Sequence, residues 1–138
     1  MNVIPKRGEI WWISLDPTKG SEIKKTRPCL IVSRDEFNRS ASTVTIIPVT
    51  SGRLRYPAWE IEIGKAEGLD GISHLVLPQI RVAAKERLKR HIGKITPAHF
   101  KEIHVKLLFY LGFDSFFGGT GSITATGATI PGGGFISL

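Results

Sequence analysis

The residues whose side chains are best suited to catalysis or ligand binding lie just before the apolar run at 29–32. Arg27 lies at an Arg-Pro step, and Glu22 is five positions upstream in a charge-dense stretch. The planar guanidinium of arginine donates two hydrogen bonds at once, which suits a phosphate better than a lysine ammonium does. Thr50 adds a hydroxyl near the end of the next apolar run. This pattern indicates a site for an anionic ligand that carries phosphate.

These residue types are sufficient for RNA cleavage without a metal ion. The 2′-hydroxyl of RNA is a built-in nucleophile, so a protein has only to remove its proton, stabilise charge on the phosphate and protonate the leaving 5′ oxygen. The structural alternative is that Arg27 forms a surface salt bridge with Glu22 and that Thr50 simply ends a strand. Composition alone favours this alternative, because the sequence does not show whether Arg27 and Thr50 meet.

The sequence contains no motif that is typical of a metal site or a nucleotide-cofactor site. The sequence contains neither a paired-cysteine motif nor an HExxH motif, so we expect no metal site. The glycine-rich stretch near the C-terminus does not follow a strand and open a helix, so we expect no nucleotide cofactor. Cys29 is the only cysteine, which we interpret as a small core residue. The four histidines are interpreted as structural or exposed; they are His74, His91, His99 and His104.

The charge balance favours a nucleic acid as partner. The chain has 138 residues, which indicates one domain, and its 19 Lys and Arg residues outnumber 12 Asp and Glu residues, giving a formal net charge of +7. A basic surface of this kind attracts anionic partners, although it can also serve solubility alone. The single cysteine fits a reducing compartment and the sequence shows no signal peptide, so we expect a cytoplasmic protein that does not bind membranes.

The elements that position these residues are mostly strands. Aromatic, β-branched and apolar runs predict six of them, at residues 9–15, 29–33, 43–50, 59–63, 74–82 and 87–95. We expect the second to be central because it is apolar on both faces, and the fourth to be half-exposed because it alternates. Pro48 predicts a bulge or edge, and Pro78 predicts an interruption of the fifth strand. The polar residues 34–42 have room for one helical turn.

One helix is predicted near the C-terminus. Thr96 is a favourable N-cap, Pro97 suits the first helical position and Gly112 can end the helix. Its apolar face is expected to carry Phe100, Ile103, Leu107, Leu108 and Leu111. Many short strands and one terminal helix indicate a mainly β fold, a small and partly open β-barrel.

The end of the chain differs in composition from the rest. Residues 115–138 carry no charge and hold seven of the 15 glycines. We therefore divide the chain into a folded domain at 1–113 and a glycine-rich tail at 114–138. The tail is expected to be flexible, with an added strand as the lesser alternative.

Three segments together resemble the MazF/PemK family of toxin endoribonucleases. They are RGEIWWISLDPTKGSEIKKTRPCLIVS, TIIPVTS and LVLPQIRVAAKERLKRHIGKITPAHFKEIHVKLLFYLGF, and they span roughly residues 6–113. The resemblance implies an SH3-like β-barrel that works as a homodimer. It also implies metal-independent cleavage of single-stranded RNA at short sequences, through a 2′,3′-cyclic phosphate, and neutralisation by a cognate antitoxin. Binding to operator DNA together with that antitoxin is implied as well.

The same resemblance implies roles for particular residues. Arg27 matches the arginine that stabilises the scissile phosphate, Thr50 the hydroxyl that assists catalysis, and Glu22 a candidate proton-transfer group. Some family members carry an Asp in the fifth-strand region, which this chain lacks, so the Arg–Thr version of the site is favoured. The remaining residues expected to bind RNA are Lys19, Ser21, Ser51, Arg53, Arg55, Gln79 and Arg81. Loops 16–26, 51–58 and 64–74 are expected to set the cut sequence.

Two other functions fit the same barrel. A relative of CcdB would bind DNA gyrase and poison it without cutting nucleic acid, gripping its target with the end of the terminal helix and a nearby tryptophan. This helix ends in FYLGF without tryptophan, which favours the endoribonuclease. The other alternative is an inactive family member that only binds an antitoxin.

Overall fold

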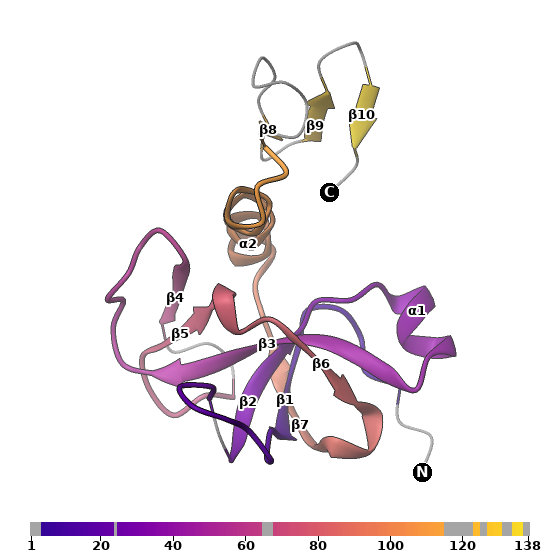
Figure 1. Cartoon of the computed structure of the whole chain (residues 1–138), viewed down its shortest axis with the longest axis vertical. Helices are drawn as coiled ribbons and strands as arrows, with labels where there is room; N and C mark the ends of the chain where they lie inside the picture. Colours follow the sequence, from indigo (N-terminus) through magenta and orange to yellow (C-terminus); the bar gives the residue numbers. More distant parts are fainter. Residues whose placement is uncertain are drawn as a thin grey trace.

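The chain folds around one bent antiparallel sheet with a helix standing on it (Figure 1). The computed structural model describes residues 4–23, 25–64 and 68–114, and the backbone of three short strands between 123 and 136. The strands of the main sheet are β1 Glu9–Ser14, β2 Thr26–Ile31, β3 Thr43–Ser51, β4 Glu60–Gly64, β5 Ser73–Val76, β6 Arg81–Ala84 and β7 Leu88–Lys94. The helices are α1 Asp35–Ser40 and α2 Pro97–Tyr110, with 3₁₀ turns η1 Leu77–Gln79 and η2 Lys85–Arg87.

The strand order is β4-β5-β3-β2-β1-β7, and β6 pairs with β3 outside this path. The central strands β2 and β3 are apolar on both faces, as predicted for the second strand. Leu30 and Ile47 pair in register and belong to one core cluster, whereas the alternating residues Cys29 and Ile46 belong to a second cluster. Because successive side chains point to opposite faces of a strand, these two strands separate two cores. Cys29 is fully buried, so the interpretation of this cysteine as a core residue is confirmed.

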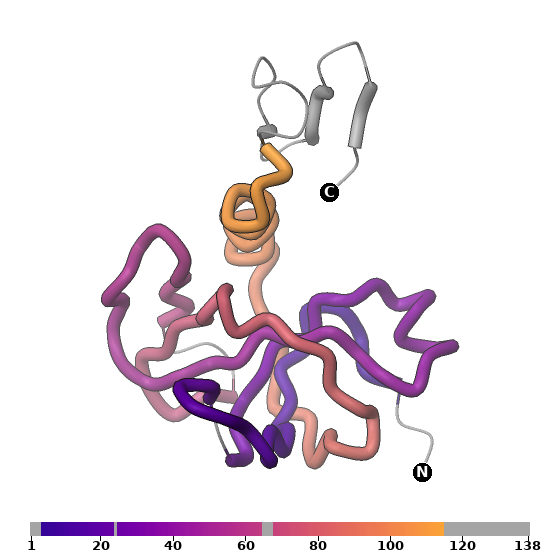
Figure 2. The backbone as a smooth tube through the Cα atoms, viewed as in Figure 1, coloured from indigo at the N-terminus to yellow at the C-terminus, as the bar shows by residue number. Residues whose placement is uncertain are grey.

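Both prolines lie where strand pairing is interrupted, and at Pro48 this is a change of partner rather than the expected bulge or edge. Residues 43–46 of β3 pair with β6, and residues 49–51 pair with β5, so Pro48 lies where β3 changes partner. A proline has no amide donor, and this position needs no continuous ladder. Pro78 lies in η1, which divides the predicted fifth strand into β5 and β6. Figure 2 follows the continuous course of the backbone, coloured along the sequence.

Helix α2 begins as predicted but covers less of the sheet than expected. The Thr96 side chain accepts a hydrogen bond from the His99 amide at 3.2 Å, which caps the helix. Ile103 is buried, and Phe100 and Leu107 pack against the same cluster. Leu111 is 46% exposed, so its predicted place on the buried face is wrong. The helix ends at 110, and its last turn extends beyond the apolar surface that the sheet offers.

Two further observations concern β4 and the C-terminal segment. Glu60 is only 5% exposed, so the prediction that the fourth strand has an exposed polar face is wrong at this position.

Strands β8 Ile123–Thr124, β9 Gly127–Ile130 and β10 Gly134–Ile136 form a separate antiparallel sheet, in which β9 pairs with both β8 and β10. The expected flexibility of 114–138 concerns residues that lie largely outside the described ones and stays a prediction. No helix of the described part is long and apolar enough to cross a membrane.

Candidate functional site

Antiparallel pairing brings the start of β2 beside the end of β3. Cys29 pairs with Pro48, and extending this register by two residues places Arg27 opposite Thr50. Both residues line a single pocket of about 300 Å³. The sequence could not show whether Arg27 and Thr50 meet, and the pairing of β2 with β3 brings them together.

Polar and apolar residues from several segments line the pocket. Trp12 enters from β1, where it pairs with Pro28, and Ser51 follows Thr50 at the end of β3. The opposite wall is the segment 68–73, which precedes and begins β5. Loops 16–26, 51–58 and 64–74 were predicted to set the cut sequence, and parts of all three line this pocket. Among the described residues, those that line it are Trp12, Lys25, Thr26, Arg27, Pro28, Val49, Thr50, Ser51 and residues 68–73.

A buried histidine holds the Thr50 hydroxyl from behind. Thr50 pairs with His74 across β3 and β5, and Thr50 Oγ1 lies 3.1 Å from His74 Nε2. The other ring nitrogen, Nδ1, lies 2.9 Å from the carbonyl oxygen of Gly52. His74 is 6% exposed, so this ring is shielded from water and fixed on both sides.

Glu60 completes this network from β4. Its Oε1 accepts hydrogen bonds from the amides of Arg55 and Tyr56 at 2.8 and 3.0 Å, and its Oε2 lies 3.7 Å from His74 Nε2. Burial alone would raise the pKa of the Glu60 carboxyl. The two amide donors, the nearby His74 ring and the charge of Arg55 together outweigh burial and hold that pKa below its usual range. The carboxylate therefore stays ionised and organises the loop that follows β3.

Helix α2 also stabilises the loop at residues 52–59, which follows β3. Lys106 Nζ donates to the carbonyl oxygens of Pro57 and Glu60 at 2.9 and 3.1 Å. Tyr56 and Trp59 stack on each other, with ring centroids 5.1 Å apart, and both are substantially exposed. The loop 52–59 is thus held by Glu60 and Lys106 while it presents aromatic rings to solvent.

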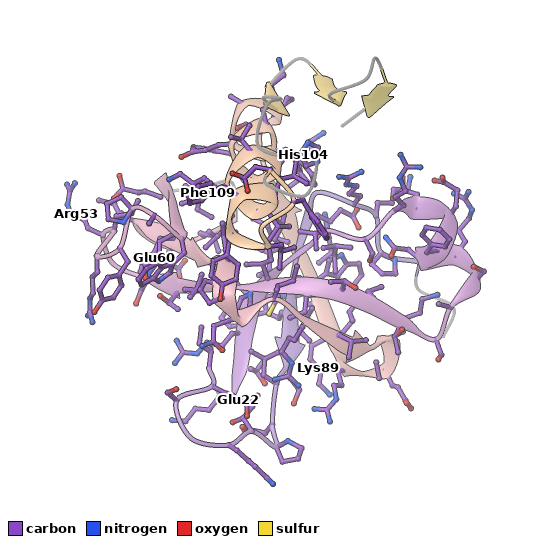
Figure 3. The ribbon with its side chains drawn as sticks, turned by 45° about the horizontal axis from the view of Figure 1, so that its top comes forward. Glu22, Arg53, Glu60, Lys89, His104 and Phe109 are labelled. Atoms are coloured by element: carbon purple, nitrogen blue, oxygen red, sulfur yellow. The ribbon has the colours of Figure 1, made fainter. Side chains whose placement is uncertain are left out.

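The other predicted site residues lie around the pocket or outside it. Ser51 lines the pocket, whereas Arg53 and Arg55 lie exposed on the loop 52–59. The residues Lys19, Ser21 and Glu22 lie exposed on the loop between β1 and β2. Figure 3 shows Glu22 on that loop, well separated from Glu60 and Arg53.

Glu22 is engaged with its own loop. Its Oε1 accepts a hydrogen bond from the Lys19 amide at 2.7 Å, and Glu22 is absent from the described residues that line the pocket. This position supports a structural role for the carboxylate in the turn. Its suggested part in proton transfer stays a prediction that the geometry does not favour.

Gln79 and Arg81 contact the β1–β2 segment through hydrogen bonds. Gln79 Oε1 accepts from the Ile23 amide at 3.4 Å, and Arg81 Nη1 donates to the Leu15 carbonyl at 3.4 Å. Neither is among the described lining residues of the pocket. The structure gives both side chains contacts that shape the loop beside Arg27.

The sequence interpretation missed the roles of His74 and Glu60. The one available sign was the alternation in WEIEI, which predicts that Glu60 and Glu62 share a face. Nothing in the spacing connects that face to Thr50, because the link runs across two strand pairs. Within 4–23, 25–64 and 68–114, no three or more His, Cys, Asp or Glu side chains form a group that could hold a metal ion.

Comparisons with known proteins agree on one family. The model for PemK-like, MazF-like toxins of type II toxin–antitoxin systems matches residues 6–111. Endoribonuclease MazF9 of Mycobacterium tuberculosis is 36% identical over 112 residues, covering 77% of this chain and 95% of that protein. An endoribonuclease from a mycobacterial species, solved with its cognate antitoxin, is 27% identical with a TM-score of 0.64, covering 78% of this chain and 95% of that one.

A crystal structure of MazF from Deinococcus radiodurans shares the fold. It has a TM-score of 0.70 at 24% identity and covers 80% of this chain and 98% of that one. The predicted fold class, a mainly β protein of MazF type with a C-terminal helix, is therefore confirmed. The chain belongs to the family of PemK-like, MazF-like toxins of type II toxin–antitoxin systems.

Proposed function

We propose that this chain is an endoribonuclease toxin that cuts single-stranded RNA at short sequences and is neutralised by a cognate antitoxin. The observation that carries the proposal is the pocket in which Arg27 and Thr50 meet. An arginine and a hydroxyl in one pocket are the groups that transesterification of RNA requires. The relative MazF9, which is 36% identical to this chain over 112 residues, is an endoribonuclease, and this supports the assignment.

The proposed reaction uses the RNA's own 2′-hydroxyl. The scissile phosphate binds beside Arg27, whose guanidinium stabilises the charge that develops on the phosphate oxygens. Thr50 contacts the 2′-hydroxyl, whose oxygen attacks phosphorus as the bond to the 5′ oxygen breaks. The products are a 2′,3′-cyclic phosphate and a 5′-hydroxyl. None of these steps needs a metal ion.

The surroundings of the pocket suit a single RNA strand. Lys25 supplies positive charge in the pocket lining, and Arg53 and Arg55 add exposed positive charge on the loop that follows β3. Trp12 in the pocket wall, and Tyr56 with Trp59 on the adjoining loop, offer flat faces for unpaired bases. Stacking of a base on an aromatic side chain contributes about 1–3 kcal/mol per base. We infer that these residues place bases on either side of the cut.

Partner chains are part of the same proposal. The end of α2 exposes Phe109, Tyr110, Leu111 and Phe113, each between 43% and 62% exposed. Figure 3 shows Phe109 on this helix. Contiguous exposed apolar side chains mark surfaces that bind other proteins. We infer that the active form is a homodimer, that a cognate antitoxin binds it, and that the two together bind operator DNA.

The deciding experiment mixes purified protein with single-stranded RNA of mixed sequence in EDTA. Site-specific fragments ending in a cyclic phosphate are expected. A substrate with hydrogen in place of the 2′-hydroxyl at the cut should remain intact, because it lacks the nucleophile. Cleavage of that deoxy substrate at the normal rate would contradict the internal attack. Intact RNA together with stalled DNA gyrase would point to a gyrase poison instead.

A further inference from the structure

Three adjacent strands place polar side chains in a row beneath the pocket. β3, β5 and β4 are neighbours in the sheet, and the register sets Thr50 opposite His74 and His74 opposite Glu62. Leu75, the next residue after His74, points into the core. Alternation therefore puts Thr50, His74 and Glu60 on the other face of these strands. Their contacts follow from the sheet register and do not depend on a mobile loop.

The hydrogen bonds assign the proton on the His74 ring. A carbonyl oxygen can only accept, so Nδ1, at 2.9 Å from the Gly52 oxygen, must donate. In the neutral ring Nε2 is then the acceptor, and the Thr50 hydroxyl at 3.1 Å donates to it. This direction leaves the lone pairs of Thr50 Oγ1 for the pocket. Thr50 is thereby prepared to accept a proton from a ligand.

We propose that His74 is a positioning residue that makes Thr50 the proton acceptor for the 2′-hydroxyl of RNA, an inference that rests on the proposed function. The O2′ proton passes to Thr50 Oγ1 while the Thr50 proton passes to His74 Nε2. At the same time O2′ bonds to phosphorus and the P–O5′ bond breaks. The leaving O5′ takes a proton from water, which leaves a hydroxide, and His74 afterwards gives up its proton through Thr50 to neutralise that hydroxide.

The Glu60 carboxylate stabilises the positive charge that His74 gains in this step. When Nε2 gains a proton, the ring becomes an imidazolium, and the Glu60 carboxylate lies 3.7 Å away in a shielded site. Attraction between opposite charges is stronger there than in bulk water. Glu60 also accepts from two amides of the loop that contains Gly52, so one carboxylate fixes both sides of the ring.

The kinetic test separates chemistry from binding. His74→Gln and Thr50→Val are measured on an RNA that the wild-type protein cuts, and affinity is measured on its 2′-deoxy form. Each variant is expected to lower kcat by about 10²-fold or more, because general base catalysis contributes about 10²–10⁴-fold. Affinity for the deoxy RNA should stay unchanged. The double variant should be no slower than the slower single variant, because the two residues act as one unit.

A matched control exists on β7. His91 Nε2 lies 3.4 Å from Glu9 Oε2, so it forms a similar pair with a glutamate, but at the surface. His91→Gln should keep the wild-type kcat. A folded His74→Gln protein with wild-type kcat, or losses that multiply in the double variant, would overturn the inference.

A second measurement does not depend on cleavage or on a variant that folds. Long-range ¹H–¹⁵N NMR spectra of the wild-type protein, at a pH where the ring is neutral, should show the proton of His74 on Nδ1. A proton on Nε2 would overturn the inference, because His74 would then donate to Thr50. If the wild-type protein cuts no RNA, the proposed function fails and the role of His74 fails with it. If it cuts RNA but the tautomer or the kinetics disagree, only the role of His74 fails.

Discussion

Replacing Arg27 with alanine tests the centre of the proposed site. Arg27 is half-buried at the start of β2 and lines the pocket together with Thr50. In the transition state its guanidinium is expected to donate to phosphate oxygens as their charge grows. Loss of one such donor in a shielded site typically costs about 10²–10³ in kcat, equivalent to about 2.7–4 kcal/mol. We expect Arg27→Ala to lose at least this much.

The fold should survive the change. Ile13 pairs with Arg27 across β1 and β2 and remains fully buried in its own cluster, so no core side chain is removed. A typical point substitution costs about 1 kcal/mol of unfolding free energy, and we expect a value of this order. Arg27→Lys keeps the charge but loses the planar pair of donors, so it should recover only part of the rate.

The assay is single-turnover cleavage of a labelled RNA, with a thermal melt of each variant in the same buffer. Arg34→Ala is the matched control, because the Arg34 side chain is 58% exposed beside Glu36, at the start of α1. It should keep the wild-type rate. A folded Arg27→Ala protein that cuts RNA at the wild-type rate would remove Arg27 from the mechanism.

Three further predictions concern stability. The lowered pKa of Glu60 means that its stabilising effect is present above the unfolded-state pKa, about 4.3, and is lost as pH falls through the lower folded-state value. Acid titration of unfolding free energy should therefore show a smaller loss in Glu60→Gln than in the wild type, and an equal loss would contradict the pKa shift. Ile103→Ala should lower unfolding free energy by about 2–5 kcal/mol in denaturant melts, whereas the exposed Lys101→Ala on the same helix should change it by less than about 0.5 kcal/mol. A chain ending at Asp114 should match the full chain in melting temperature and cleavage rate, and a large drop in melting temperature would make residues 115–138 part of the fold.

Much of the fold could be predicted because its determinants are local. Runs of aromatic, β-branched and apolar residues placed the strands, Pro78 marked the break before β6, and Thr96 with Pro97 marked the start of α2. These features depend on residues within a few positions of one another. The misplaced Leu111 shows the limit of such reasoning. Helical periodicity assigns a residue to a face, but it does not say how far the sheet extends beneath that face.

The site was predictable only in part. The Arg-Pro step and the strand-end hydroxyl identified Arg27 and Thr50 as candidates, because their chemistry is carried by the residue types themselves. Their meeting was not predictable, since it depends on the antiparallel register of β2 and β3. Glu22 illustrates the opposite case. It is close to Arg27 in sequence, yet its carboxylate accepts from the Lys19 amide in the same loop.

The sequence by itself therefore determined the family, the strands, the helix start and the two residues most suited to phosphate chemistry. Only the tertiary structure decided which polar residues contact Thr50, namely His74 and, next to it, Glu60. Thr50, His74 and Glu60 come from three separate strands, and a shift of one residue in either pairing would turn His74 toward the core. Register is set by the burial of the whole apolar face, so no short segment encodes it. For that reason the network behind Thr50 exists only in the folded sheet.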